Sequence, residues 1–125
     1  MREVARFFIG TDVSNWKGTN GESAFQSIDF VSLALRLIGL VPASFNPTGG
    51  EGLAALLKIF NQGENISIGQ IAVYKNGIFD FFSIMTEYAG GIVGVWNGMI
   101  QIISPIPFKP FALPWFTFYP WAPIY

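Results

Sequence analysis

The spacing of apolar residues predicts a helix over residues 23–40. Apolar side chains cover most of a helical wheel drawn for this segment. The remaining positions form a narrow polar stripe of Gln26, Asp29, Ser32 and Arg36. Ser23 followed by Gln26 has the spacing of a capping box, which predicts the start of the helix. Gly39 and Pro42 favour its end, because glycine commonly closes a helix and proline cannot continue one.

A second, shorter helix is predicted after the first. Thr48 and Glu51 repeat the capping-box spacing, and apolar residues then recur at helical intervals up to the polar run 61–63. Residues 23–62 therefore predict an amphipathic helical hairpin whose apolar faces pack against a core or lie on a membrane surface. Residues 1–22 are expected to form an N-terminal arm and a polar loop. Their apolar run Phe7-Phe8-Ile9 is too short for the core of a signal peptide.

Two interpretations are open for the chain beyond the predicted connector, residues 63–77. The dipeptide Asn76-Gly77 favours a tight hairpin turn, with residues 78–85 as the returning strand. The alternative is one helix over residues 78–104, ended by Pro105. On a helical wheel, this segment separates into a polar arc rich in glycine and an arc of Ile, Phe, Met and Trp. Strand alternation would mix these two sets, so the pattern favours the helix.

The polar arc of this predicted helix has the residues of a close helix–helix contact. Gly90, Gly94 and Gly98 form two overlapping GxxxG steps, which let two helix backbones approach closely. Asn97 and Gln101 lie on the same arc and would form hydrogen bonds across the contact. We therefore predict these five residues as a helix-packing site.

The distribution of charge suggests that the same helix crosses a membrane. Glu87 is followed by a single charged residue, Lys109. The uncharged segment 88–108 is close to the roughly 20 residues that a helix needs to span a bilayer. A transmembrane helix over residues 78–104, a membrane location and contact with a lipid bilayer are therefore predicted. The alternative is a helix buried inside a large assembly.

The C-terminal residues 105–125 combine many prolines with many aromatic side chains. Proline at this density argues against a helix or a central strand and predicts an extended arm. The aromatic side chains would anchor this arm in a membrane interface or in a groove of a neighbouring subunit. The predicted anchors are Phe108, Phe111, Trp115, Phe116, Phe118, Tyr119, Trp121 and Tyr125. The predicted fold is thus mainly α, with a helical hairpin, one long glycine-faced helix and an extended arm.

Composition excludes several classes of function. Charged residues make up 12% of the 125-residue chain, against about 25% in ordinary globular domains. The net charge of −1 does not fit a nucleic-acid-binding protein. The chain has no His and no Cys, which removes the commonest catalytic and metal-binding side chains. We therefore predict no enzyme activity, cofactor, metal or small-molecule substrate.

Two patterns with catalytic spacing do not change that prediction. Ser14 and Lys17 match S-x-x-K, but the other motifs of the penicillin-binding enzymes are missing. On the predicted helix, Asp80 and Glu87 would lie about 10 Å apart, beyond the usual range of glycosidase carboxylates. They are expected to hold a helix end in solvent.

Three functional hypotheses remain. The first is a non-enzymatic structural or assembly subunit of a membrane-bound complex or virion, which binds other protein subunits. The second is a pore-forming protein, holin-like or channel-like, lined by the polar arc. The third is a soluble structural component of a large particle, such as a phage capsid or tail. The absence of catalytic side chains and the aromatic C-terminal segment favour the first hypothesis.

Overall fold

The structure, a computed structural model, describes residues 1–18, 25–48, 50–63, 67–75, 80–87, 91–94, 102–106 and 115–123. The helices in these ranges are α1 (Arg2–Phe8), α2 (Ser27–Leu37) and α3 (Gly52–Ile59). The strands are β1 (Phe60–Gly63), β2 (Ile71–Lys75), β3 (Asp80–Glu87), β4 (Gly91–Gly94), β5 (Ser104–Ile106) and β6 (Trp115–Pro123).

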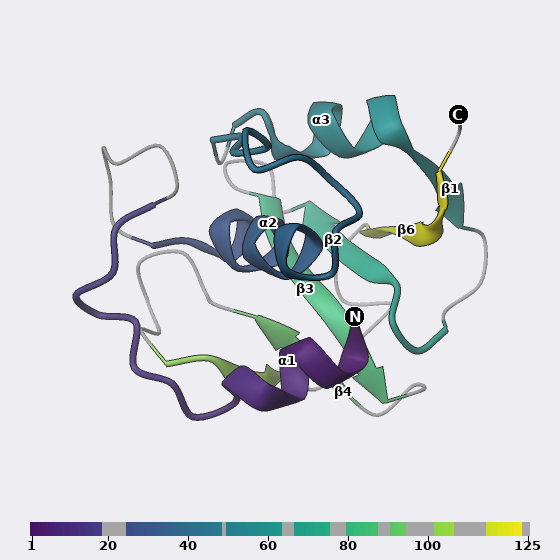
Figure 1. The fold of residues 1–125 in the computed structure, drawn as a ribbon. Helices are drawn as coiled ribbons and strands as arrows, with labels where there is room; N and C mark the ends of the chain where they lie inside the picture. The colour runs from purple at the N-terminus through teal and green to yellow at the C-terminus, as the bar shows by residue number, and fades with distance from the viewer. Residues whose placement is uncertain are drawn as a thin grey trace.

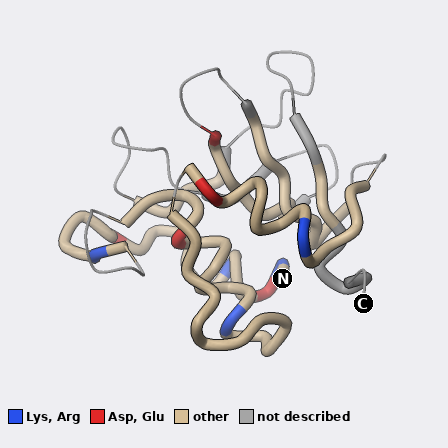
Figure 2. Tube along the Cα trace, turned by 90° about the horizontal axis from the view of Figure 1, so that it is seen from above, with Lys and Arg blue, Asp and Glu red and all other residues tan. Residues whose placement is uncertain are grey.

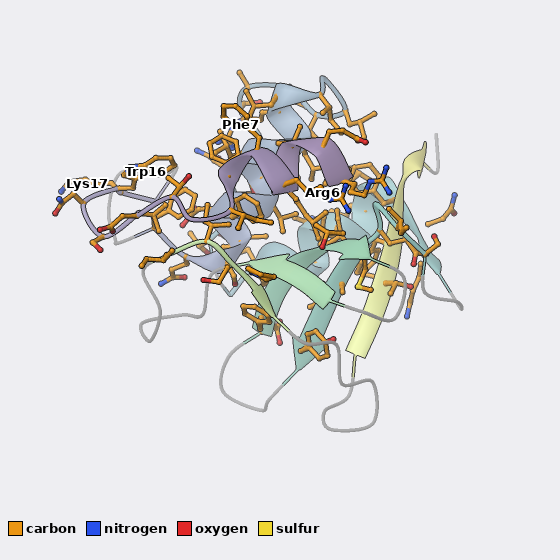
Figure 3. The ribbon with its side chains drawn as sticks, turned by 90° about the horizontal axis from the view of Figure 1, so that it is seen from below. Arg6, Phe7, Trp16 and Lys17 are labelled. Atoms are coloured by element: carbon orange, nitrogen blue, oxygen red, sulfur yellow. The ribbon has the colours of Figure 1, made fainter. Side chains whose placement is uncertain are left out.

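The described elements form two layers. The strands make one antiparallel sheet in the order β1-β6-β2-β3-β4-β5. Helix α2 lies across this sheet, with α3 on one side of it and α1 on the other (Figure 1). Charged residues are spread along the described trace, with Arg2 and Glu3 adjacent near its start (Figure 2). Seen from below, the helices form one layer and the sheet forms the other (Figure 3).

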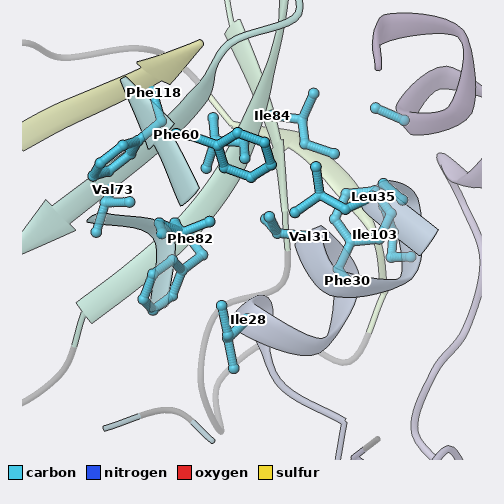
Figure 4. Packing of buried hydrophobic residues seen from close by; sticks show 14 of the residues in the cluster. Ile28, Phe30, Val31, Leu35, Phe60, Val73, Phe82, Ile84, Ile103 and Phe118 are labelled. Atoms are coloured by element: carbon cyan, nitrogen blue, oxygen red, sulfur yellow. The ribbon is translucent and has the colours of Figure 1, made fainter. Parts of the chain in front are cut away.

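The core lies between the helices and one face of the sheet. Cross-strand partners on this face are Ile71 with Ile84, and Val73 with Phe82, while Phe118 of β6 lies opposite Ile71. All five side chains are fully buried against those of α2 (Figure 4). Burial of large apolar side chains is worth about 1.5–3 kcal/mol each, so this layer contact is the main source of stability.

Local signals fix both ends of α2. At its start, the backbone amide of Gln26 donates to Asp29 Oδ2 at 2.8 Å, which completes a capping box. At its end, Gly39 has a φ of 76°, and its amide donates to Arg36 O at 3.1 Å. The amide of Leu40 donates to Leu35 O, as in a Schellman motif. The helix thus begins later than predicted, and Ser23 lies outside the described residues.

Thr48 and Glu51, the residues with the predicted capping-box spacing, form hydrogen bonds just before α3. Thr48 Oγ1 donates to Glu51 Oε1 at 2.7 Å, and the Thr48 amide donates to the same oxygen at 3.3 Å. The helix then begins at Gly52. The pair therefore closes the turn before the helix.

The long helix predicted over residues 78–104 is wrong. Strands β3, β4 and β5 occupy the described part of this range, and β3 pairs antiparallel with β2. Side chains 81–86 are buried on both faces of β3, and its two polar members, Ser83 and Thr86, fall on opposite faces, so the strand shows no alternation of apolar and polar residues. Periodicity does not separate such a strand from a buried helix segment. A strand returning antiparallel to β2 agrees with the hairpin interpretation, although this strand covers Asp80–Glu87 and the predicted turn at residues 76–77 lies outside the described residues.

The transmembrane prediction is wrong for the same reason. Within the residues that the structure describes, no helix is long and apolar enough to cross a membrane.

The extended C-terminal arm is also wrong, because β6 lies inside the sheet between β1 and β2. Residues 115–118 pair with β2, and Thr117, Phe118 and Tyr119 pair with β1. The register with β1 then shifts, so that residues 120–122 have no partner in β1. Pro120 falls within this irregular stretch, where a missing amide hydrogen costs no regular ladder bond. The prolines thus limit the pairing without preventing the strand.

Candidate interaction surface

A series of aromatic side chains runs from the core to the surface beside α1. The ring of Phe8 lies edge-to-face with the buried Phe30 of α2, with 6.3 Å between centroids. Phe8 makes the same kind of contact with Trp16 at 6.5 Å and with Phe7 at 5.2 Å. Trp16 in turn packs edge-to-face on the buried Phe25 at 5.3 Å. Such contacts are favourable beyond simple burial, so they hold the outer rings in place.

The outer members of this series are open to solvent. The exposed fraction of the side chain is 81% for Phe7, 41% for Ile9 and 36% for Trp16. Figure 3 shows Phe7 and Trp16 on the same side of the helical layer. We call Phe7, Phe8, Ile9 and Trp16 the aromatic surface. Among the large apolar side chains of the described residues, Phe7 is the most exposed.

The chain after α1 positions Trp16 by docking beside β5. Gly10, with a φ of 88°, reverses the chain, and its amide donates to Ile103 O at 2.7 Å. The amide of Ile103 donates back to Thr11 O at 3.0 Å. The amide of Phe25 donates to Trp16 O, which ties the segment to the start of α2. The backbone under the aromatic surface is therefore fixed by hydrogen bonds at both ends.

The charges beside the aromatic surface are held locally. Arg2 Nη2 lies 3.4 Å from Glu3 Oε1 in an exposed ion pair. The hydroxyl and the backbone amide of Ser14 donate to Asp12 Oδ1, and they lower the pKa of that carboxyl. Lys17 adjoins Trp16 in the chain (Figure 3). The surface therefore combines a large apolar area with a few charges of both signs.

An apolar groove lies on α3, in another part of the helical layer. It has a volume of about 550 Å³ and is lined by Phe45, Asn46, Pro47, Gly50, Glu51, Ala54, Ala55, Lys58 and Ile59. Arg36 Nη1 donates to Phe45 O at 2.7 Å, which fastens the loop wall of the groove to α2. Hydrogen bonds from Thr48 lower the pKa of Glu51 at the rim, so this carboxylate is ionised at neutral pH.

Gly94 is the one predicted helix-packing residue within the described ranges, and it lies in a strand. Gly94 is the last residue of β4, where it pairs with Ser83 of β3 and with Ser104 of β5. The other predicted members, Gly90, Asn97, Gly98 and Gln101, lie outside the described residues.

The predicted aromatic anchors belong mostly to β6. Phe118 is fully buried in the protein's own core, so it does not reach a neighbouring subunit. Trp115, Phe116, Tyr119 and Trp121 are residues of the same strand. The remaining predicted anchors, Phe108, Phe111 and Tyr125, lie outside the described residues.

The two carboxylates considered for catalysis are separated by the strand. Asp80 and Glu87 are the first and last residues of β3. At about 3.3 Å per residue their backbones lie roughly 23 Å apart, not on one helix face. Ser14 donates its hydroxyl to Asp12 in an exposed turn, and its S-x-x-K partner Lys17 is also exposed. Within the described ranges there is no group of three acidic side chains that could hold a metal ion.

Sequence reasoning missed the aromatic surface. Its signal in the sequence is the run Phe7-Phe8-Ile9, which is too short for the core of a signal peptide. Phe7 and Phe8 are adjacent on α1, about 100° apart around the helix, and Ile9 follows its end, so the three side chains do not share one face. The contribution of Trp16 depends on the turn at Gly10, which sequence spacing does not reveal.

Comparison with known proteins gives no further guide to function. No protein-family model matches the chain, and neither do the curated proteins or the solved structures with which it was compared. The virion hypothesis therefore gains no support from any relative.

Proposed function

We propose that this protein is a non-enzymatic assembly subunit that binds a neighbouring protein through its aromatic surface. The observation that carries the proposal is the 81% exposure of Phe7 on a ring that Phe8 holds in a fixed orientation. Burying a Phe side chain is worth about 1.5–3 kcal/mol, so an exposed one is a strong source of binding energy. Binding energy at protein interfaces is concentrated in such aromatic anchors.

The size of the aromatic surface supports a binding role. From the fractional exposures, the side chains expose on the order of 300 Å² of apolar area. Patches of this size are the largest on a typical monomer and are often functional. The rings are already ordered by their contacts with Phe25 and Phe30, so a partner would order few side chains on binding.

The alternative hypotheses have less support. The pore and the membrane-bound assembly both depended on a helix over residues 78–104, where the described residues form strands. The third hypothesis, a structural component of a large particle, does not need that helix. The net charge of −1 still argues against a nucleic acid as the partner.

Site-specific crosslinking in the cells that make this protein tests the proposal. A benzophenone amino acid replaces Ile9, at the edge of the aromatic surface, so that Phe7 and Trp16 stay intact. The matched control replaces Leu57, which is 50% exposed on α3 and lies outside this surface. We expect irradiation to give a discrete adduct from position 9 and none from position 57. The adduct should disappear when Phe7→Ala is added, while circular dichroism stays unchanged.

Two outcomes would contradict the proposal. Irradiation that gives the same adducts from positions 9 and 57 would mean that the contacts are random. An adduct that persists in full with Phe7→Ala would mean that the aromatic surface does not hold the partner.

A further inference from the structure

We infer that two copies of this chain exchange β6, so that the strand of each copy lies between β1 and β2 of the other. The exchange does not depend on the aromatic surface, and it goes beyond the proposed function. Two features of the sheet support it, the directions of β5 and β6 and the short length of chain that joins them.

Strands β5 and β6 run in the same direction, although all neighbouring strands of the sheet are antiparallel. The pairs β2–β3, β3–β4 and β4–β5 make β5 opposite in direction to β2, and β6 is also antiparallel to β2. In the sheet, β2, β3 and β4 lie between β6 and β5. A chain that enters its own sheet must therefore reverse direction after β5, pass three strands and reverse again before β6.

The connection between these strands is short for such a path. Only residues 107–114 join Ile106, the end of β5, to Trp115, the start of β6. A crossover between parallel strands needs about a dozen residues or more, usually with a helix, and three prolines in this connection argue against a helix. The four strand spacings alone take roughly 19 Å of the roughly 30 Å that the connection reaches when fully extended. Short, constrained hinges favour the exchange of an element between copies.

The contacts of β6 select a second copy as the partner. Phe118 is fully buried and pairs with Ile71 of β2 and Gln62 of β1, and Thr117 Oγ1 donates to Gly63 O at 3.1 Å. The strands that pair with β6 are β1 and β2, and β5 is not one of them. An exchanged strand meets the same residues in the other copy, so these contacts are kept, while the connection no longer has to reverse twice.

Exchange also determines how the monomer and the dimer interconvert. Because β6 is paired on both sides, it cannot leave the sheet unless β1 and β2 separate from it. A monomer and an exchanged dimer should therefore persist after they are separated, and they should re-equilibrate only when the protein is unfolded. Association through exposed side chains, such as the aromatic surface, would instead reverse on dilution.

The absence of cysteine from the chain allows a direct test. Ala72 of β2 and Thr117 of β6 are opposite each other and fully buried, so Ala72→Cys combined with Thr117→Cys should form one disulfide. The full chain is unfolded in urea, refolded with reductant at a series of concentrations, separated by size-exclusion chromatography and oxidised. On a denaturing gel without reductant, we expect covalent dimers from the dimer fraction and covalent monomers from the monomer fraction. The two single-cysteine variants are the controls and should give no covalent dimer.

A longer connection tests the cause of the exchange without any cysteine. Insertion of eight Gly and Ser residues after Pro110 gives the chain enough length to reach its own sheet, so the refolded protein should shift from dimer to monomer. The same insertion after Gly21, outside this connection, is the matched control and should leave the dimer fraction unchanged. An equal dimer fraction in both insertion variants would overturn the short connection as the cause.

Three further outcomes would overturn the exchange. They are a protein that refolds only to monomers at every concentration, a dimer fraction that gives only covalent monomers, and a dimer that disappears with Phe7→Ala. The last outcome would assign the dimer to the aromatic surface. The crosslink at position 9 tests the proposed function by itself, so the exchange and the aromatic surface can fail separately.

Discussion

At the scale of single residues, the packing of α3 on the core requires a glycine at position 52. A Cβ at Gly52 would lie 2.5 Å from Phe82 Cζ and 2.8 Å from Ile28 Cδ1. Both neighbours are almost fully buried, so neither has free space in which to move. Glycine here allows the first turn of α3 to approach α2 and β3 closely.

Gly52→Ala is therefore expected to lower the free energy of unfolding by about 1–3 kcal/mol, the usual effect of overpacking. This loss should exceed the gain of up to about 1 kcal/mol that alanine brings to a helix. Urea denaturation followed by circular dichroism measures the change. Gly50→Ala is the matched control, because a Cβ there meets nothing within 4 Å. Equal effects of the two substitutions would show that the close approach is not the cause.

At the scale of elements, the sequence predicted what local signals determine. The glycine cap after α2 at Gly39 and the hydrogen bonds of Thr48 to Glu51 follow from short-range chemistry, and both are present, although α3 begins at Gly52, three residues later than the capping-box spacing predicts. β3 was missed because both of its faces are buried, which removes the alternation that identifies a strand. The number of prolines in residues 105–125 argues against β6, whereas the register places Pro120 where pairing with β1 is interrupted. The positions of β3 and β6 both depend on contacts between residues that are far apart in the sequence.

Burial of β3 on both faces predicts how it responds to charge. Ile84 and Met85 are adjacent, so their side chains point to opposite faces of the sheet, and both are fully buried. Ile84→Lys and Met85→Lys should each cost more than about 4 kcal/mol, because each buries an unpaired charge. We expect thermal denaturation of either variant to show no cooperative transition. Gln62→Lys, at an exposed position of the edge strand β1, is the control and should unfold like the wild type. A cooperative transition in either lysine variant of β3 would mean that one face of this strand is exposed to solvent.

At the scale of the whole molecule, the two end segments of the described chain complete the sheet. β6 joins β1 to β2, and the backbone of residues 10–11 is hydrogen-bonded to Ile103 next to β5. The segment before α2 and the last strand are thus parts of the fold, although the sequence predicted an arm at each end. The aromatic surface is a product of this arrangement, since Trp16 reaches Phe8 only through the turn after α1.

Removal of residues 115–125 should therefore unfold the protein. The truncation takes Phe118 from the core and leaves β1 and β2 without the strand between them. We expect the far-ultraviolet circular dichroism to lose its strand signal and the thermal transition to lose its cooperativity. A chain that ends at Pro123 keeps all of β6 and serves as the control. A truncated protein that melts cooperatively near the wild-type temperature would mean that β6 is a dispensable arm.

The place of β6 in the sheet also sets the order of events during synthesis. The ribosome makes β1 and β2 well before β6, yet both strands must wait for β6 to fill the gap between them. Until then the nascent chain carries two unpaired strand edges beside an apolar face, which is the condition under which chains aggregate. Pairing at such long sequence separation is also slow. Folding of this protein is thus completed only after residue 123 has left the ribosome, and a nascent-chain chaperone would raise its yield.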